Sequence, residues 1–473
     1  MFGSACPQQG GSIPDVLPFT IPVQTPNNTV SEDCLFVNVY APTSAKPGDN
    51  LPVVFWIYGG AFETGDSSMY PGTAIVERSI ELGEPVIFVS HNYRLNAFGF
   101  LASQEVVDAG QTNIGLRDQR FAMQWVQQHI SAFGGDPTKV TIWGESAGAW
   151  SVGFHLLLNN GDNEGLFRAA IMESGSPYAL RNYTAGQPFY DTLLNYTNCS
   201  SSADTLACLR HAPYEQLMAA VNATPNGFDY TGQNLAWQPR LDGDLFVRNP
   251  QRSMQMGLYA KVAILSGDCD DEGTLFSLGN TNITSDSEFL SYIHSNYIPS
   301  ATDSAIVNVS KLYPDIPSEG SPFDTGDSNV LTAQYKRIAA FTGDWQFQAP
   351  RRLLLSTMSQ TQDCWAYLFK RYKTTPYLGT YHSSDLTEFF SDIDFIGTDA
   401  IINFANRLNP NASPRLAPNV SYFSNVTWAQ WDSNLSSPPL LEFLDPAPRL
   451  GFTPDTYRAD AMAYLNTLSL QMP

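Results

Sequence analysis

One short stretch constrains the fold of this chain more than any other: "KVTIWGESAGAWSVGFHLLL", residues 139–158. A β-rich run comes first, a helix-forming run comes last, and the pattern Gly-X-Ser-X-Gly lies between them. In that context the pattern predicts a nucleophile elbow, a tight strand-to-helix turn that exposes the hydroxyl of Ser146. Glycines at 144 and 148 remove side chains that would clash across such a turn. The alternative is a small serine at an ordinary strand–helix junction.

Short apolar runs alternate with helical patterns along the chain, which predicts a mostly parallel sheet with helices on both faces. The expected strands are 35–40, 53–58, 86–90, 139–143, 169–173, 261–266 and 364–370. The expected helices include 116–133, 147–158, an interrupted stretch over 328–359, and 458–470. No repeat or charge block divides the sequence, so residues 1–473 are interpreted as one domain. Residues 180–330, rich in prolines and polar residues, are interpreted as helical excursions that decorate the sheet.

A serine nucleophile needs a base and an orienting acid. In this class of fold the chain order is serine, acid, histidine. That order excludes His91, His129 and His155, and also His211 if the acid lies in the next strand loop. Of the two histidines that remain, His294 lies in a helix-like stretch and is interpreted as packed or at the surface. His382, in "LGTYHSSDL", follows an expected strand and is the predicted base.

The acid is expected in "VAILSGDCDDEGTLF", which follows another expected strand. The stretch offers four carboxylates, and their spacing does not choose among Asp268, Asp270, Asp271 and Glu272. A pocket of backbone N–H groups for an oxyanion is the third requirement. "VVFWIYGGAFETG" supplies a strand that runs into the loop Gly59-Gly60-Ala61, the natural partner of the Ala147 N–H. The alternative for this loop is an ordinary glycine turn.

Six cysteines indicate an oxidising compartment. The expected disulfides are Cys6–Cys34, which brackets a proline-rich segment, and Cys199–Cys208, nine residues apart. Cys269 and Cys364 are expected to be free. Cys269 lies just past the end of one expected strand and Cys364 opens another, so parallel neighbours would hold the two sulfurs far apart.

The net charge of −21 argues against nucleic acid or an anionic membrane surface as a partner. No run of eighteen uncharged apolar residues occurs, so no transmembrane segment is expected, and "MFGSACPQQG" does not read as a signal peptide. Eleven Asn-X-Ser/Thr sequons nevertheless favour a secreted glycoprotein. No His/Cys cluster has metal-ligand spacing and no phosphate loop occurs, so neither a metal nor another cofactor is expected. The sequence leaves the oligomeric state open.

Several long segments resemble the type-B carboxylesterase/lipase family, the cholinesterase-like branch of the α/β-hydrolases, and most of all its secreted fungal lipases of the Candida rugosa type. They include "SEDCLFVNVYAP" (31–42), "FWIYGGAFETG" (55–65), "NYRLNAFGFL" (92–101), "SGDCDDEGTLF" (266–276) and "GTYHSSDL" (379–386), besides the segment 113–151 around Ser146. The resemblance implies an α/β-hydrolase fold with Ser146 as nucleophile, Glu272 as acid and His382 as base. It places oxyanion donors at Gly60, Ala61 and Ala147, supports both disulfides, and suggests a buried Arg94–Asp136 ion pair.

Two departures from the family stand out. The third glycine of its oxyanion loop is Ala61 here, which adds strain on the order of 1 kcal/mol if the position needs positive φ. Only five residues precede Cys6, so the chain is interpreted as shortened at its N-terminus, with an exposed sheet edge and with Glu32 lacking its usual arginine.

Residues 6–34 correspond to the disulfide-bounded lid of the family's lipases. Prolines at 14, 18, 22 and 26 exclude a helix through this stretch, which predicts an extended rim that leaves the site open. We therefore expect a secreted hydrolase of dispersed small-molecule or lipid esters with weak or no interfacial activation. The alternatives are a true lipase or sterol esterase with a full lid, a peptidase or amidase, and an inactive cholinesterase-like binding or adhesion protein.

Overall fold

The computed structural model describes residues 2–21, 26, 28–390, 394–417 and 420–472. Nine strands form one sheet in the order β1-β3-β2-β4-β5-β6-β7-β8-β9. All neighbouring strands are parallel except the pairs β1–β3 and β8–β9 at the two edges. The strands are β1 (Val37–Tyr40), β2 (Leu51–Ile57), β3 (Ile87–His91), β4 (Gly135–Glu145), β5 (Ala169–Glu173), β6 (Ala263–Cys269), β7 (Cys364–Phe369), β8 (Pro439–Phe443) and β9 (Leu450–Pro454).

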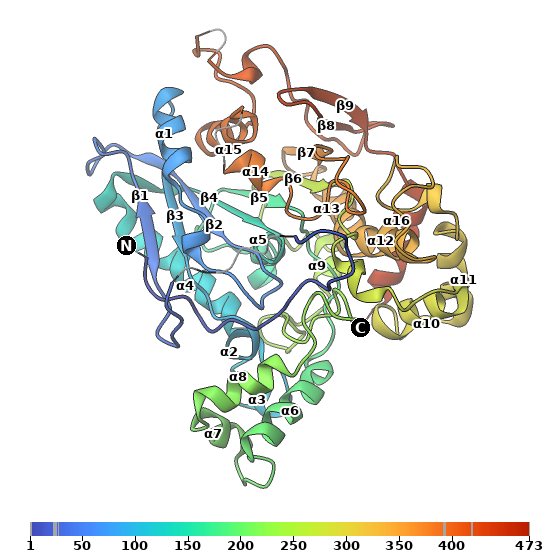
Figure 1. Ribbon diagram of the computed structural model, residues 1–473. Helices are drawn as coiled ribbons and strands as arrows, with labels where there is room; N and C mark the ends of the chain where they lie inside the picture. The colour runs from blue at the N-terminus through green and yellow to red at the C-terminus, as the bar shows by residue number, and fades with distance from the viewer. Residues whose placement is uncertain (1, 22–25, 27, 391–393, 418–419, 473) are drawn as a thin grey trace.

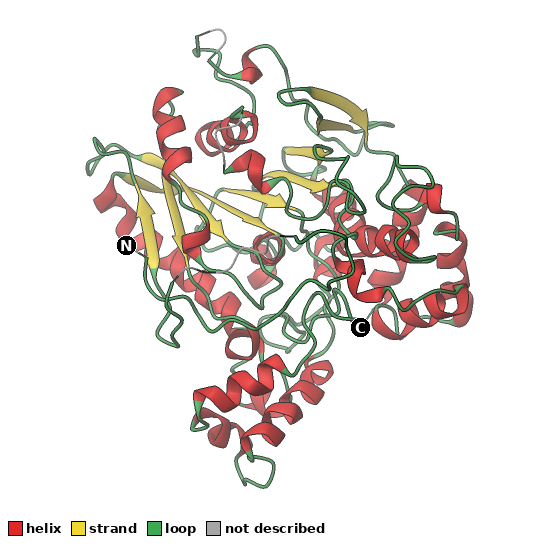
Figure 2. Ribbon diagram, in the orientation of Figure 1, coloured by secondary structure: helices red, strands yellow, loops and turns green. Residues whose placement is uncertain are grey.

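Helices cover both faces of this sheet (Figures 1 and 2). On one side lie α1 (Thr73–Glu81), α14 (Leu386–Phe389) and α15 (Ile396–Arg407), and on the other lie α4 (Ile114–His129) and α5 (Ala147–His155). Every residue of β3, β5 and β7 is buried, as the nearly continuous apolar runs of those strands require. Every residue of α5 is buried as well, so the helix that follows Ser146 is held on all sides.

The remaining helices extend from the sheet as two groups (Figure 1). Toward the bottom of the view lie α2 (Asn96–Phe100), α3 (Gln104–Asp108), α6 (Gln187–Thr197), α7 (Thr205–Arg210) and α8 (Tyr214–Asn222). The second group is α9 (Pro250–Gln255), α10 (Asp286–Asn296), α11 (Asp303–Leu312), α12 (Tyr335–Gly343), α13 (Ala349–Met358) and α16 (Ala459–Gln471). A π-helical turn, Asp344–Gln348, joins α12 to α13.

All seven predicted strands are present, and the sheet confirms the predicted fold class. Two edge strands, β8 and β9, were not predicted. Both disulfides are formed, with S–S distances of 2.03 Å for Cys6–Cys34 and 1.99 Å for Cys199–Cys208. Cys269 and Cys364 are free and buried. In the parallel β6–β7 register Cys364 lies beside Ile264 and Cys269 beside Phe369, so the two cysteines occupy opposite ends of the strand pair.

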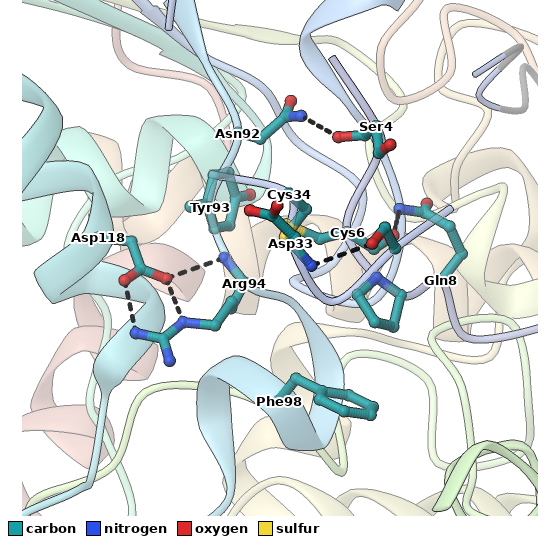
Figure 3. Close-up of a disulfide and its surroundings, with 12 residues drawn as sticks. Ser4, Cys6, Gln8, Asp33, Cys34, Asn92, Tyr93, Arg94, Phe98 and Asp118 are labelled. Carbon is teal, nitrogen blue, oxygen red and sulfur yellow. Dashed lines mark hydrogen bonds and ion pairs between the residues drawn. A yellow bond between two sulfur atoms is a disulfide. The ribbon is translucent and has the colours of Figure 1, made fainter. Parts of the chain in front are cut away.

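The expected Arg94–Asp136 ion pair was wrong. Arg94 pairs with Asp118, through 2.7 Å contacts from both Nε and Nη2, next to the Cys6–Cys34 disulfide (Figure 3). Asp118 lies near the start of α4, and its carboxylate also accepts the Arg94 N–H at 3.1 Å. Asp136 opens β4 at the far end of that helix and pairs with Lys139 at 3.1 Å. Asp118 was not considered as the partner from the sequence, because its contact with Arg94 depends on how α4 packs against the segment that carries Arg94.

Candidate active site

Ser146 occupies the turn between β4 and α5, with φ 56° and ψ −124°. A non-glycine residue rarely adopts these angles, so the surrounding structure must enforce them. Two contacts do so: the Ser146 N–H donates to Glu173 O at 2.9 Å, and the Trp150 N–H donates to Ser146 O at 2.9 Å. The side chain is 6% exposed. The turn therefore has the strained geometry that the sequence pattern predicts.

The two glycines of the turn are required by close backbone approach. A methyl group on Gly148 would lie 1.9 Å from the carbonyl oxygen of Ile57, and one on Gly144 would lie 2.4 Å from the carbonyl carbon of Gly148. Such distances are far inside van der Waals contact, so no other residue fits without moving β2 or α5. The glycines thus let the strand, the turn and the next strand of the sheet pack directly on one another.

His382 links the serine to an acid. Its Nε2 lies 2.7 Å from Ser146 Oγ and its Nδ1 lies 2.5 Å from Glu272 Oε2. His382 comes from the loop after β7 and Glu272 from the loop after β6, so the carboxyl ends of neighbouring parallel strands bring together residues 236 and 110 positions apart. Burial lowers the pKa of His382, although the nearby carboxyls of Glu145 and Asp385 act in the opposite direction and raise it. The imidazole is therefore neutral near neutral pH and able to accept a proton.

The structure separates Glu272 from the other three acid candidates. Asp268 pairs with the buried Arg351 at 2.8 Å, and Asp270 pairs with Lys373 at 2.6 Å. Asp271 accepts hydrogen bonds from the Thr380 N–H at 2.8 Å and from Lys373 at 2.7 Å. The contacts of Asp270 and Asp271 tie the loop after β6 to the loop that carries His382. Glu272 alone of the four reaches the imidazole, and its other oxygen accepts from the Cys269 N–H at 2.7 Å.

The loop after β2 lies against Ser146. A methyl group on Gly59 would come within 2.8 Å of Ser146 Cβ. Within the described residues, the N–H groups of Gly60 and Ala61 donate to no protein acceptor. Ala61 has φ 58° and Phe62 has φ 60°, so the position of the missing third glycine does require the left-handed region. The strain expected for Ala61 is present, and the loop keeps its free donors.

We predict that Ala61→Gly increases the free energy of unfolding by up to about 1 kcal/mol. Glycine adopts the left-handed region without steric cost, although it also gains freedom in the unfolded chain. Urea unfolding of the two proteins would measure the difference. A clear loss of stability would show that the Ala61 methyl makes contacts that outweigh its strain.

Three further side chains surround the histidine, and sequence reasoning missed two of them, Phe347 and Glu145. The rings of Phe347 and Phe276 have centroids 4.7 Å and 5.0 Å from that of His382. Phe347 lies in the π-helical turn between α12 and α13, and such turns are frequent at functional sites. Glu145, the variable residue of the Gly-X-Ser-X-Gly pattern, is buried, accepts a hydrogen bond from the Ser383 hydroxyl and lies 3.5 Å from His382 Nε2. Its position next to Ser146 was the available signal.

The described part of residues 6–34 contains no helix. Leu17 is buried in a cluster with Leu275, Leu278, Tyr335 and Leu378, and Ile13, Val16 and Ile21 pack on the same cluster. Leu275 follows Glu272 by three residues, so this segment lies over the loop that carries the acid. Prolines 18 and 14 fall within it as expected, whereas Pro22 lies outside the described residues.

The fold and the turn at Ser146 together define a class. A mostly parallel sheet, with a strained serine where a central strand meets a buried helix and with a histidine and an acid on later strand loops, is an α/β-hydrolase. The sequence pattern of the carboxylesterase family matches residues 1–434. The chain therefore belongs to the carboxylesterase family, a family of carboxylic-ester hydrolases.

Individual relatives agree with this assignment. "Lipase 5" of Diutina rugosa is 43% identical over 392 residues, which cover 81% of this chain and 71% of that protein. "Secreted lipase 1" of Botryotinia fuckeliana is 38% identical over 448 residues, covering 92% of this chain and 76% of that one. The crystal structure of Aspergillus niger EstA superimposes with a TM-score of 0.81 at 27% identity and covers 99% of this chain and 88% of its own.

Proposed function

We propose that this protein is a secreted serine ester hydrolase that acts through an acyl-enzyme, with Ser146 as nucleophile, His382 as base and Glu272 as orienting acid. The observation that carries the proposal is the continuous hydrogen-bonded path from Ser146 Oγ through both nitrogens of His382 to Glu272, with distances of 2.7 Å and 2.5 Å. Such a path activates a hydroxyl that is otherwise a weak nucleophile.

The reaction follows from that geometry. His382 Nε2 takes the hydroxyl proton as Ser146 Oγ bonds to the ester carbonyl carbon, and Glu272 stabilises the imidazolium through Nδ1–H. The N–H groups of Gly60, Ala61 and Ala147 hold the resulting oxyanion. Collapse of this intermediate breaks the bond to the alcohol, which leaves with the proton from His382. Water then repeats the sequence on the acyl-enzyme and releases the acid.

Covalent capture tests the proposal. An organophosphonate inhibitor should label the protein once and abolish hydrolysis of p-nitrophenyl acetate, butyrate and palmitate, and mass spectrometry should find the adduct on the peptide that contains Ser146. Ser146→Ala is the control, which should take up no label. An inactive binding protein of this fold would hydrolyse none of the three esters, and a peptidase would prefer an anilide to the matching ester. Labelling of another residue with full activity in Ser146→Ala would refute the mechanism.

We predict no sharp rise in rate as a substrate passes its solubility limit. The described part of the rim has no amphipathic helix that could swing onto an oil surface, and its stem is fixed: the Gln9 N–H donates to Glu63 O at 3.0 Å and the Gly10 N–H donates to Asn222 Oδ1 at 2.8 Å. The rate against tributyrin concentration should therefore rise smoothly and saturate. The competing proposal, a true lipase with a mobile lid, draws on the relatives' names and on the apolar side chains at 13, 16, 17 and 21. A steep increase at the onset of emulsion would favour it.

Secretion is supported by several independent features. Eight sequon asparagines are exposed, which N-glycosylation requires: Asn182, Asn195, Asn198, Asn222, Asn282, Asn308, Asn425 and Asn434. Asn411 is half-buried, and Asn27 and Asn419 lie outside the described residues. The two disulfides fit an oxidising compartment, and two similar fungal proteins are named secreted lipases. No helix within the described residues is long and apolar enough to cross a bilayer.

A further inference from the structure

Glu63 lies two residues beyond Ala61 and is part of the turn that shapes the oxyanion loop. Its N–H donates to Gly60 O at 2.9 Å, and its carbonyl oxygen accepts the Gln9 N–H at 3.0 Å. The residue is 4% exposed. Glu63 therefore connects the loop that lies against Ser146 to Gln9, near the start of the 6–34 segment.

The carboxyl group of Glu63 reaches a third segment. Oε2 accepts the Gly227 N–H at 3.0 Å. Gly227 packs directly on the oxyanion loop, because a methyl group placed on it would lie 3.5 Å from Ala61 Cβ. A displacement of Glu63 would therefore move Ala61 in two ways, through the backbone of the loop and through the contact between Gly227 and Ala61.

No hydrogen bond from the described residues offsets the burial of the second carboxyl oxygen of Glu63. Oε1 is buried without a hydrogen-bond partner in the described part of the chain, as is Oε1 of the adjacent Gln9. No lysine, arginine or histidine among the described residues forms an ion pair with Glu63. The titratable group that faces it is Asp229, from the same segment as Gly227, and its charge is of like sign. The side chains of Gln9 and Asn96, from two other segments that contact this loop, are amides that donate to Thr224 O and Pro7 O.

We propose that Glu63 is a positioning residue of the oxyanion hole that works as a neutral carboxylic acid, tying the 60–63 loop to Gly227. This inference rests on the oxyanion role proposed above for Gly60 and Ala61. A proton on Oε1 removes a buried charge and replaces an unpartnered acceptor by a donor. Burial raises the pKa of Glu63 to about 8, and Asp229 adds to the rise. The acid form thus predominates at neutral pH, and ionisation above that pKa places an unpaired charge beside the loop.

The pH dependence of turnover tests the proposal. Oxyanion donors act on the transition state more than on bound substrate, so kcat of the wild type should fall above about pH 8 while KM changes little. Glu63→Gln imitates the neutral acid, so its kcat should lie within about threefold of wild type at pH 7 and should not fall at pH 8. Glu63→Ala, which removes the tie, should lose about tenfold or more at every pH. Glu77→Gln, an exposed glutamate of α1, should behave as wild type.

Thermal unfolding supplies a readout that does not need activity. The pKa of Glu63 is higher in the folded state than in the unfolded state. The wild-type protein therefore loses stability as the pH rises from the unfolded-state pKa to the folded-state pKa, whereas the Glu63→Gln protein does not. The melting temperature of Glu63→Gln minus that of wild type should therefore increase between about pH 5 and pH 8 and then level off. A difference in melting temperature that stays constant with pH would overturn the proposal for Glu63. This readout is independent of the proposed function, which fails separately if Ser146→Ala is active.

A second variant covers the case in which Glu63→Gln does not fold. Asp229 is exposed, and removal of its charge relieves part of the repulsion on ionised Glu63. Asp229→Asn should therefore shift the alkaline fall of kcat to lower pH. A shift to higher pH, no shift, or a Glu63→Gln protein with the wild-type alkaline fall would each contradict a neutral Glu63.

Discussion

Ser146→Ala is expected to lower kcat for p-nitrophenyl butyrate by about 10⁶-fold while KM changes little, the scale seen when a triad serine is removed. In the proposed mechanism this hydroxyl forms the covalent bond to the acyl group, and within the described residues no other hydroxyl or thiol is both in the same turn and hydrogen-bonded to His382. The small residual rate should come from substrate binding and from the N–H groups of the oxyanion loop, which act without the serine. Initial rates of protein freed of contaminating esterases would measure it.

The three residues should also lose activity as a unit. His382→Ala should cost about as much as Ser146→Ala, and the double variant should cost no more than either, because each single change already disables the same step. Glu272→Gln should cost less, about 10⁴-fold, since the imidazole stays in place but loses the partner that fixes its tautomer. Additive losses in the double variant would mean that Ser146 and His382 serve separate functions despite their 2.7 Å contact.

Much of this site could be predicted because each residue lies where a recognisable local pattern ends. Ser146 follows a strand and precedes a helix, and both His382 and the acid candidates follow apolar strands. In a parallel sheet those ends meet at one edge. Spacing alone left four acids, and the choice of Glu272 came from resemblance. The structure gives the physical reason, because the other three carboxylates already bind Arg351, Lys373 or backbone N–H groups.

Features that depend on packing between distant segments could not be predicted. The strands β8 and β9 are short and flanked by Pro438, Pro446 and Pro448, so their sequence is typical of a loop, and only pairing at the sheet edge makes them strands. The partner of Arg94 depends on how α4 packs against the segment 92–95, because that packing brings Asp118 within 2.7 Å of the guanidinium. Of the two aromatic rings beside His382, Phe347 comes from a helical stretch whose interruption was expected but whose π-helical turn was not.

The second large effect is expected in stability, at a charge cluster behind the site. The side chain of Arg351 is fully buried, and so are those of its partners Asp268 and Asp455. Arg351 contacts them at 2.8 Å and 2.9 Å. It joins α13 to β6, the strand that leads to Glu272, and to the residue after β9. Arg351→Met should therefore decrease the free energy of unfolding by about 3–5 kcal/mol, because the buried Asp268 loses its cation and Asp455 keeps only Arg352. Denaturant unfolding at pH 8 would measure this loss.

The neighbouring Arg352 provides a matched control for that measurement. It contacts the same Asp455 at 2.6 Å but is 14% exposed, and its removal leaves Arg351 in place. Arg352→Met should cost only about 1–2 kcal/mol. The loss in Arg351→Met should also shrink toward pH 5, because burial already raises the pKa of Asp268 to about 7 with Arg351 present, and without the cation this carboxyl takes a proton more readily. Equal losses in both variants, independent of pH, would show that Arg351 stabilises the fold through its packed side-chain volume and that its charge contributes little.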